Sequence, residues 1–466
     1  MQAEGRTMED GRHGRPDLDS GAPVSFSLPP SAFIAIKSII ELHSTQERAI
    51  LVGAPIKRSN ARHHVTEHLE ELERLADTAG ATVVGTLTQQ LDRPDPATYI
   101  GRGKVDELKV MIGEKDATLV IFDDELSPAQ GKNLEGELGK RVIDRAELIL
   151  DIFAVRARSA EARMQVELAQ LEYSLPRLTR MWTHLEKFRG GIGVRGPGET
   201  QLETDRRLVG QRIKLLKDRL EEVSKARVVQ RAGRVGSFRA SLVGYTNAGK
   251  SSILRGVSGE REIFVEDRLF ATLDPLTREV ELGEHQAVLL TDTVGFIRKL
   301  PHHLVASFRA TLEEVTEADL LLHVIDASHP GWEEQRLVVD DVLAELGVHD
   351  VPMVYVFNKM DRLSPEMQQA LKDRIENLAP GSVYTSANDS AGLDPLRELL
   401  RQRLRDRRPE VTLLIPLTDG RLLAEAHRAG ENIESEPDED EGVMRIRGRF
   451  DAASLGRLER GGAVRE

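Results

Sequence analysis

The sequence predicts a multidomain α/β fold: an N-terminal α/β domain, a long α-helical hairpin linker, a second α/β domain whose mostly parallel sheet is flanked by helices, and a small C-terminal α/β domain. Three observations support it. The chain of 466 residues is too long for one hydrophobic core, short apolar runs alternate with helical patterns in two separate regions, and the strand signal disappears between about 145 and 232. We place the parts at 1–45 (mostly disordered N-terminal extension), 46–150 (N-terminal α/β domain), 151–235 (basic helical hairpin with a Gly-rich loop), 236–406 (second α/β domain) and 407–466 (C-terminal α/β domain).

Composition excludes several classes of protein. There is no cysteine, so disulfides, thiolate metal sites and a cysteine nucleophile are excluded. We find no stretch of about 18 apolar residues and no secretion signal in the first residues, and we expect a cytoplasmic protein without a membrane partner. The formal net charge is −13, which argues against binding nucleic acid with the whole surface.

The N-terminal domain is expected to alternate between strands and helices. Its apolar runs and helical spacings indicate a strand at Ala49–Val52, a helix at His64–Ala79, a strand at Ala81–Leu87, a helix at Val105–Ile112 and a strand at Thr118–Phe122. This repetition predicts a small, mostly parallel sheet with helices packed on it.

The helical region carries a local excess of positive charge. Two long helical patterns, Ala146–Leu185 and Leu202–Val229, flank the Gly-rich segment from Phe188 to Glu199, which predicts an antiparallel pair joined by a mobile loop. From Arg156 to Arg234 there are 18 Lys and Arg against 10 Asp and Glu, a local net charge of +8 that leaves −21 for the remainder. Charge alone is compatible with a polyanionic partner or with a solvated hairpin.

The first nucleotide motif is GYTNAGKS, Gly244 to Ser251, which follows the apolar run Ser241–Val243. It has the G-x-x-x-x-G-K-S pattern, whose glycines let backbone N–H groups surround a phosphate at the start of a helix. Lys250 is expected to bridge the β- and γ-phosphates, and Ser251 to give its hydroxyl to Mg²⁺.

Two further segments have the pattern of switch regions. In Phe270–Arg278, Thr272 is our candidate for the threonine that senses the γ-phosphate, with Thr277 as its rival. An apolar strand then ends in DTVG, Asp292 to Gly295, which would place a carboxylate beside the metal and an amide beside the γ-phosphate. Phe296 follows at the position where Ras-like GTPases carry the glutamine that orients the attacking water, so hydrolysis is expected to depend on another group or on a partner.

The last two segments select the base. Val354–Phe357 leads into NKMD, in which Asp361 can accept two hydrogen bonds from guanine that adenine cannot offer. Asn358 is expected to tie this loop to the phosphate loop, and Lys359 to lie along the base. Thr385–Ala387 could present backbone N–H groups to the guanine oxygen. Together the five segments predict a P-loop G domain and a magnesium-dependent GTPase that converts GTP to GDP and phosphate.

The residues that we assign on these grounds fall into three groups. The catalytic candidates are Lys250, Thr272 and Gly295, and the Mg²⁺ ligands are Ser251, Thr272 and, through water, Asp292. The GTP-binding residues are Gly244, Tyr245, Thr246, Asn247, Ala248, Gly249, Lys250, Ser251, Ser252, Phe270, Ala271, Thr272, Leu273, Asp274, Asp292, Thr293, Val294, Gly295, Asn358, Lys359, Met360, Asp361, Thr385, Ser386 and Ala387.

Outside the G domain the sequence resembles the HflX family of translation-associated GTPases, of the P-loop TRAFAC class. The matching segments are GVRGPGETQLETDRR (Gly193 to Arg207), DPATYIGRGKVDEL (Asp95 to Leu108) and DDELSPAQGKNLE (Asp123 to Glu135), together with FATLDP and DTVGFI. The resemblance implies the same four-part fold, binding to the 50S ribosomal subunit and its rRNA under control of the GTP state, and a role in splitting or rescuing stalled ribosomes. It also implies a monomer off the ribosome. Arg189, Arg195, Arg206 and Arg207 are the RNA-binding candidates.

Two alternatives remain for the function and one for a minor motif. The protein could be a 50S assembly factor, or a GTP-switched regulator of protein or membrane partners. The Gly-x-Gly-Lys turn in Ile100–Lys104 is read as the start of a helix, with a phosphate contact as the alternative. None of the 13 histidines has the sequence spacing of a ligand cluster with acidic partners. In the C-terminal unit we expect a strand at Val411–Ile415, a helix at Gly420–Ala429, an acidic turn at Glu434–Glu441 and a strand at Val443–Arg449.

Overall fold

The structure is a computed structural model that describes most of the chain from residue 47 onward. The described residues are 47–57, 64–178, 198–232, 238–260, 268–283, 286–300, 314–389, 391–407, 409–438 and 440–466. The expected N-terminal extension, most of the Gly-rich loop with Arg189 and Arg195, and the helical pattern beyond residue 178 lie outside them.

The first sheet is fully parallel, with the strand order β2-β1-β3-β4, as the β–α alternation predicts. Its four strands alternate with helices along the chain. The fourth strand was not predicted from sequence, because only two apolar residues mark it. The elements are β1 (Arg48–Gly53), α2 (Val65–Thr78), β2 (Thr82–Thr88), α3 (Arg102–Lys115), β3 (Leu119–Phe122), α4 (Pro128–Leu138), β4 (Arg141–Asp144) and α5 (Arg145–Arg156).

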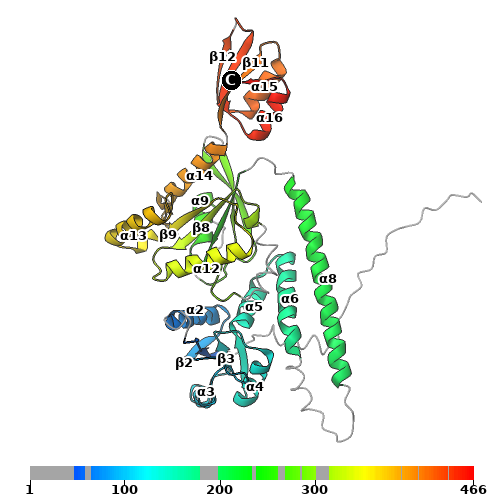
Figure 1. The fold of residues 1–466 in the computed structure, drawn as a ribbon, viewed down its shortest axis with the longest axis vertical. Helices are drawn as coiled ribbons and strands as arrows, with labels where there is room; N and C mark the ends of the chain where they lie inside the picture. Colours follow the sequence, from blue (N-terminus) through cyan, green and yellow to red (C-terminus); the bar gives the residue numbers. More distant parts are fainter. Residues whose placement is uncertain are drawn as a thin grey trace, which may run out of the picture. The chain divides into compact units, whose positions relative to one another are not determined.

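Alternate residues of β1 enter two different cores. Ala49 and Leu51 pack in the cluster that contains buried residues of α2 and α5, whereas Ile50 and Val52 pack in the cluster that contains those of α3 and α4. Successive side chains of a strand point to opposite faces, so a strand covered on both faces becomes continuously apolar. The sheet is therefore a middle layer between two pairs of helices (Figure 1).

The helical region differs from the single long helix that we expected between Ala146 and Leu185. The chain forms α5, leaves helical geometry at Ala157, and begins again as α6 (Ala160–Ser174), followed by a short 3-10 turn, η2 (Leu175–Arg177). Ser159 causes the restart, because its hydroxyl accepts a hydrogen bond from the amide of Ala162 at the start of α6.

The second expected helix is present as α8 (Gly198–Ala232), which runs beside α6 (Figure 1). Ion pairs join the two helices, among them Arg212 with Glu167, at 2.7 Å, and Lys217 with Glu172, at 2.8 Å. Such pairs between exposed groups add little stability each, so they explain the pairing of two highly charged helices only together with buried residues such as Val209 and Leu216.

The second sheet has the order β10-β9-β8-β5-β7-β6, with β6 antiparallel to β7 and the other neighbours parallel. Helices α9 and α14 pack on one face, and α12 and α13 contribute to clusters on the other. The elements are β5 (Phe238–Gly244), α9 (Lys250–Ser258), β6 (Leu276–Gly283), β7 (Gln286–Asp292), β8 (Leu320–Asp326), α12 (Trp332–Glu345), β9 (Met353–Asn358), η3 (Met360–Arg362), α13 (Pro365–Leu378), β10 (Val383–Tyr384), η4 (Ala391–Leu393) and α14 (Asp394–Arg407).

This topology gathers the nucleotide motifs at one edge. The phosphate loop follows β5, Asp292 ends β7, Asn358 ends β9, and Thr385–Ala387 follows β10. The carboxyl ends of parallel strands lie at one edge of a sheet, where ligands bind in open α/β folds. Strand order, rather than sequence separation, therefore brings these segments together.

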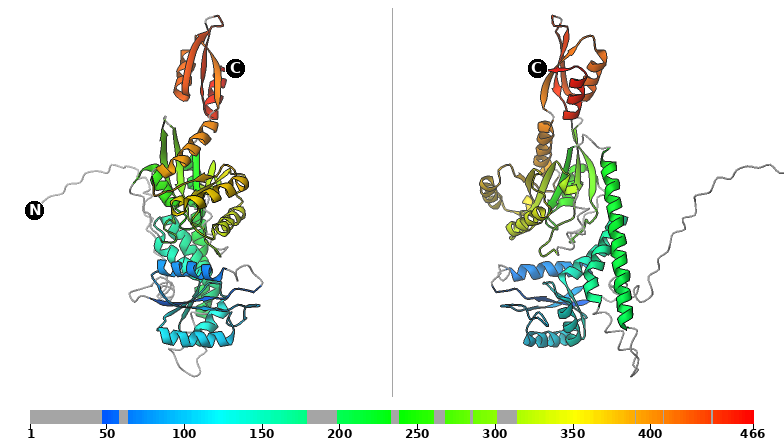
Figure 2. Two further views of the ribbon diagram at one scale, coloured as in Figure 1. Left: turned by 90° about the vertical axis from the view of Figure 1, so that its left-hand side faces the viewer. Right: turned by 45° about the vertical axis from the view of Figure 1, so that its right-hand side comes forward.

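The C-terminal sheet is antiparallel, with the order β12-β13-β11-β14, and α15 and α16 cover one face (Figure 2). The expected acidic turn at Glu434–Glu441 is wrong for most of its length, because these residues belong to an edge strand. Glu434 and Glu436 pair across the sheet with Arg447 and Arg445, and opposite charges stabilise such pairs. The elements are β11 (Glu410–Pro416), α15 (Gly420–Ala429), β12 (Glu431–Asp438), β13 (Val443–Arg449), α16 (Ala452–Arg460) and β14 (Val464–Arg465).

Within the described ranges, no helix combines the length and the apolar composition needed to cross a bilayer. The Gly-x-Gly-Lys turn lies at the start of α3, with Gly101 as the residue before the helix and its amide bonded to the side chain of Gln89. The structure thus places this motif in a turn and helix start.

Candidate nucleotide-binding site

The phosphate loop is folded against the base-reading loop. Gly249 has a φ of 99° and precedes α9, and a Cβ atom at this position would lie 2.2 Å from Nδ2 of Asn358. Only glycine fits here, because both the backbone angle and the space exclude a side chain. The Nδ2 group of Asn358 donates a hydrogen bond to the carbonyl of Ala248 at 3.0 Å. Asn358 therefore joins the two loops, as the sequence predicts.

Lys250 is the first residue of α9 and is buried within the loop. Its Nζ donates hydrogen bonds to the carbonyls of Gly244, at 3.0 Å, and Tyr245, at 2.9 Å. Burial lowers the pKa of Lys250 to about 8, although the nearby carboxylate of Asp292 acts in the opposite direction. An anion beside the ammonium group would compensate the cost of burying its charge.

Three oxygen atoms from separate segments converge beside Lys250. The Ser251 hydroxyl lies 2.6 Å from Oδ2 of Asp292 and 2.9 Å from the Thr272 hydroxyl, which lies 3.0 Å from the same carboxylate oxygen. Burial raises the pKa of Asp292, and within the described part of the chain its Oδ1 has no hydrogen-bond partner. Two hydroxyls and a carboxylate are ligands of the kind that Mg²⁺ prefers.

The rival switch residue, Thr277, lies elsewhere. Its hydroxyl is 2.9 Å from that of Thr291, across the β6–β7 pair. The geometry therefore favours Thr272 as the threonine that faces the metal ligands.

Gly295 brings the second switch segment against the phosphate loop. A Cβ atom on Gly295 would lie 2.8 Å from Cα of Thr246 and 3.1 Å from Nζ of Lys250. Phe296 then pairs with the phosphate loop, because its amide bonds to the carbonyl of Gly244 and its carbonyl accepts from the amide of Thr246. The Phe296 ring is only 1% exposed. It belongs to the core and cannot orient a water molecule.

The base-reading segments form a second group. Lys359 Nζ contacts the carbonyl of Asn247 and Oδ2 of Asp326, both at 2.7 Å. The amide of Asp361 donates to the hydroxyl of Ser386 at 3.1 Å, which leaves the exposed Asp361 carboxylate at the surface of the loop. The amide of Ala387 donates to Oδ1 of Asn358 at 3.1 Å. NKMD and the Thr385–Ala387 segment are thus held together.

A pocket lies over the phosphate loop. It is lined by Thr246, Asn247, Gly249, Lys250, Ser251, Ser252, Phe270, Ala271, Thr272, Thr293 and Gly295. All eleven were predicted as nucleotide-binding residues, and they combine backbone amides, one cation and the metal ligand set. This arrangement can hold a polyphosphate chain with its counter-ion.

Several predicted residues do not line this pocket. Leu273, Val294 and Met360 are buried. Asp274 points to the helical region, where its carboxylate accepts hydrogen bonds from the amides of Arg158 and Ser159. Asp326 was missed, although an acidic residue at the end of an apolar strand is a usable signal.

The RNA-binding candidates are only partly described. Arg206 and Arg207 lie exposed on α8, whereas Arg189 and Arg195 lie outside the described residues. Of the four candidates, the structure therefore describes only the two on α8.

The switch segment also contacts the N-terminal domain. The Tyr245 hydroxyl accepts a hydrogen bond from the amide of Arg298 at 2.9 Å and bonds to the carboxylate of Glu71 on α2. Lys299 Nζ lies 2.6 Å from Asp124 and also pairs with Asp123. The charges of Arg145 and Lys299 outweigh burial and hold the pKa of Asp123 at about 2.

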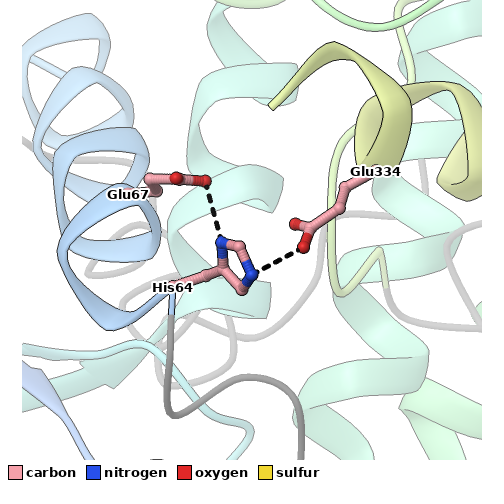
Figure 3. Close-up of side chains that lie close together, drawn as sticks. All are labelled: His64, Glu67 and Glu334. Carbon is pink, nitrogen blue, oxygen red and sulfur yellow. Dashed lines mark ion pairs between the residues drawn. The ribbon is translucent and has the colours of Figure 1, made fainter. Parts of the chain in front are cut away.

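Beside these contacts lies a group that could be read as a metal site. Figure 3 shows His64, at the start of α2, between Glu67 and Glu334, and among the described residues it is the only His, Asp and Glu group close enough to share an ion. Sequence spacing did not reveal this group, because Glu334 comes from α12. Arg298 lies 2.9 Å from Glu334 and 3.6 Å from Glu67. The guanidinium group already supplies the positive charge, so we read the group as an ion-pair cluster.

Comparison with known proteins agrees with this site. The chain matches three family descriptions in succession: GTP-binding GTPase N-terminal over residues 66–154, GTP-binding GTPase Middle Region over 156–234, and 50S ribosome-binding GTPase over 239–359. It is 47% identical over 401 residues to the GTPase HflX of Caldanaerobacter subterraneus subsp. tengcongensis, a match that covers 86% of this chain and 90% of that protein. It is 44% identical over 394 residues to the GTPase HflX of Escherichia coli, with 84% and 92% covered.

Solved structures give a weaker likeness. A GTP-binding protein from Sulfolobus solfataricus in complex with GDP is 25% identical, covers 77% of this chain and 98% of its own, and has a TM-score of 0.42. The sequence matches, which extend over most of both chains, are the stronger finding.

Proposed function

The chain belongs to the HflX family of GTPases, and from this premise we propose that it hydrolyses GTP with the residues described above while bound to the 50S ribosomal subunit. GTP hydrolysis itself follows from the family. We propose which residues bind GTP, that Mg²⁺ is the metal, and that the 50S subunit is the partner.

The observation that carries the site assignment is the convergence of Ser251, Thr272 and Asp292 beside Lys250. Lys250 would bind the β- and γ-phosphates, and the three oxygen atoms would hold Mg²⁺, with Asp292 acting through water. The ion would neutralise charge on the phosphate oxygens. Support comes from Oδ1 of the buried Asp292, which has no hydrogen-bond partner among the described residues and which a metal ion or its bound water would satisfy.

The base would be read at the other end of the site. The Asp361 carboxylate accepts from the two guanine donors. The amides of Thr385, Ser386 and Ala387 donate to Phe357, Gly392 and Asn358, so this segment supports the NKMD loop rather than presenting free amides to the guanine oxygen. Asn358 keeps this segment and the phosphate loop in one arrangement, since it bonds to both. The loop that selects guanine and the loop that binds the phosphates would therefore keep a fixed position relative to each other.

The 50S subunit is the proposed partner. Support comes from the description of the family that matches residues 239–359 and from the exposed Arg206 and Arg207 on α8. Contacts between basic side chains and the phosphates of folded RNA release counter-ions and need no reading of bases. We further propose that the protein is cytoplasmic, is a monomer when off the ribosome, and splits or rescues stalled ribosomes.

The test is GTP turnover with and without purified 50S subunits. We expect slow turnover alone and at least about tenfold stimulation by 50S, because groups supplied in trans to GTPases raise rates by about 10³–10⁵. The GTP-bound protein should sediment with 50S, and the double variant Arg206→Glu/Arg207→Glu should lose stimulation while it keeps basal turnover.

A matched control is Arg374→Glu/Arg403→Glu, which reverses two exposed charges on α13 and α14. It should retain stimulation. Absence of both stimulation and co-sedimentation at moderate salt would exclude the 50S subunit as the partner. Accumulation on precursor rather than mature subunits would identify an assembly factor instead.

A further inference from the structure

Lys359, the second residue of NKMD, is held by two other loops of the same domain. Its Nζ donates a hydrogen bond to the carbonyl of Asn247 in the phosphate loop and another to Oδ2 of Asp326 at the end of β8, both at 2.7 Å. The contact with Asp326 has the length of a strong charge-assisted hydrogen bond. An ammonium group has three N–H donors, so these two contacts leave one donor for a nucleotide.

Asp326 itself is fixed by the chain around it. It is the last residue of β8 and lies beside Asn358, the last residue of β9, in the sheet. Its Oδ1 accepts hydrogen bonds from the amide of Ser328, at 3.0 Å, and from the Ser328 hydroxyl, at 2.6 Å. These bonds limit the rotation of the carboxylate and leave Oδ2 facing Lys359. The carboxylate therefore has a defined position without a nucleotide.

The ion pair between Asp326 and Lys359 is largely shielded from solvent. The two side chains are 14% and 13% exposed, and a mostly buried ammonium group that loses its partner is strongly unfavourable. The backbone of Lys359 has a φ of 63°, in the left-handed region that residues other than glycine rarely adopt. Such a conformation persists only where the surrounding contacts hold it. Among the described residues, Asp326 is the carboxylate that holds the end of this side chain.

We propose that Asp326 is a positioning residue for the guanine nucleotide, which holds the Lys359 side chain along the base before the nucleotide binds. A free lysine side chain loses much rotamer freedom when it is fixed. A side chain that is already fixed in the free protein avoids this loss on binding, which raises the affinity. Asp326 acts through Lys359 and does not touch the nucleotide. The inference rests on the proposed base site at NKMD and is independent of the ribosomal partner.

The test is the affinity of the full chain for GDP, measured by calorimetry, and the rate at which a fluorescent GDP analogue dissociates. Asp326→Asn keeps the size of the side chain and removes its charge. We expect the affinity for GDP to fall by about 5- to 50-fold, mainly through faster dissociation. The matched control is Asp350→Asn, which makes the same change at an exposed position before β9 and should bind GDP as the parent does.

A double-mutant cycle separates positioning from a structural effect. Lys359→Met keeps an unbranched side chain and removes the ammonium group. If Asp326 acts through Lys359, adding Asp326→Asn to Lys359→Met should lower the affinity for GDP by less than about twofold further, because the effects of coupled residues do not add. A purely structural role of Asp326 would give the same loss in both backgrounds.

Ser328→Ala provides a second variant if the melting temperature shows that Asp326→Asn does not fold. It removes the hydroxyl that bonds to Oδ1 of Asp326 and leaves both charges of the ion pair in place. We expect the affinity for GDP to fall by about two- to fivefold in the parent and to stay the same in the Lys359→Met background.

Two results would overturn the proposal. One is an affinity of folded Asp326→Asn for GDP within about twofold of the parent. The other is an equal loss in the two backgrounds, for Asp326→Asn or for Ser328→Ala. Both results leave the proposed function intact, because the parent would still bind GDP in preference to ADP. A parent protein without that preference would instead contradict the base site itself.

Discussion

Replacement of Lys250 by alanine is expected to lower the affinity for GTP by at least about 30-fold and to abolish measurable turnover. The side chain lines the phosphate pocket, and it is the only cation among the described residues that line it. Loss of one partner of a buried charge pair costs about 2–5 kcal/mol, and each 1.4 kcal/mol is a factor of about ten in affinity. Titration with a fluorescent GTP analogue measures the effect.

The melting temperature of Lys250→Ala without nucleotide shows whether the variant is still folded. Burial lowers the pKa of Lys250, so its removal relieves a desolvation penalty even as two hydrogen bonds to backbone carbonyls are lost. We therefore expect the melting temperature without nucleotide to change little, and the exposed Lys109→Ala on α3 to behave as the parent in both assays. Unchanged GTP affinity in Lys250→Ala would show that the phosphates bind elsewhere.

Asp361→Asn is expected to change the base that the protein prefers. In the proposed site the carboxylate accepts two hydrogen bonds from guanine, and the loss of a bidentate base contact costs about 1–3 kcal/mol. The affinity for GDP should therefore fall by about 5- to 150-fold. The affinity for xanthosine diphosphate should rise, because the asparagine amide can donate a hydrogen bond to the second carbonyl of xanthine. The aspartate carboxylate repels that carbonyl.

Calorimetric titration of the variant with both nucleotides tests this reversal. The matched control is Asp373→Asn, which makes the same change at an exposed position of α13 and should leave the preference for guanine intact. A variant at Asp361 that binds GDP as the parent does would place the base-reading contact on another residue.

The nucleotide site could be predicted from sequence because each of its parts is a short local segment. Gly249, for example, is required by the turn itself, and the structure shows that Asn358 leaves no room for a side chain there. The order of the segments along the chain also fixes their strands, and a mostly parallel sheet then brings the strand ends to one edge. Local sequence and topology together were sufficient to predict the residues that line the pocket over the phosphate loop.

Contacts between distant segments could not be predicted in this way. Asp274 follows a switch motif, yet its carboxylate accepts hydrogen bonds from the amides at the start of α6, more than 100 residues earlier in the chain. His64 joins Glu334 on a helix of another domain. No periodicity or spacing marks such a pair, because its members become neighbours only after folding.

Errors in secondary structure have a related cause. The break between α5 and α6 depends on the Ser159 cap and on hydrogen bonds to Asp274, while the helical pattern of side chains continues across it. The edge strand β12 is rich in acidic residues and resembles a turn in composition. It forms a strand because Arg445 and Arg447 lie opposite Glu436 and Glu434. In both places, contacts with residues distant in sequence determine the secondary structure.

The most direct test of the account is a calorimetric titration of the full chain with GDP and with ADP in the presence of Mg²⁺. The central claim is that the phosphate loop and the NKMD loop, tied by Asn358, bind one nucleotide and select guanine. We expect saturable heat at one site per chain with GDP, and an affinity for ADP lower by at least about tenfold. Equal binding of the two nucleotides, or no heat with GDP, would contradict the claim.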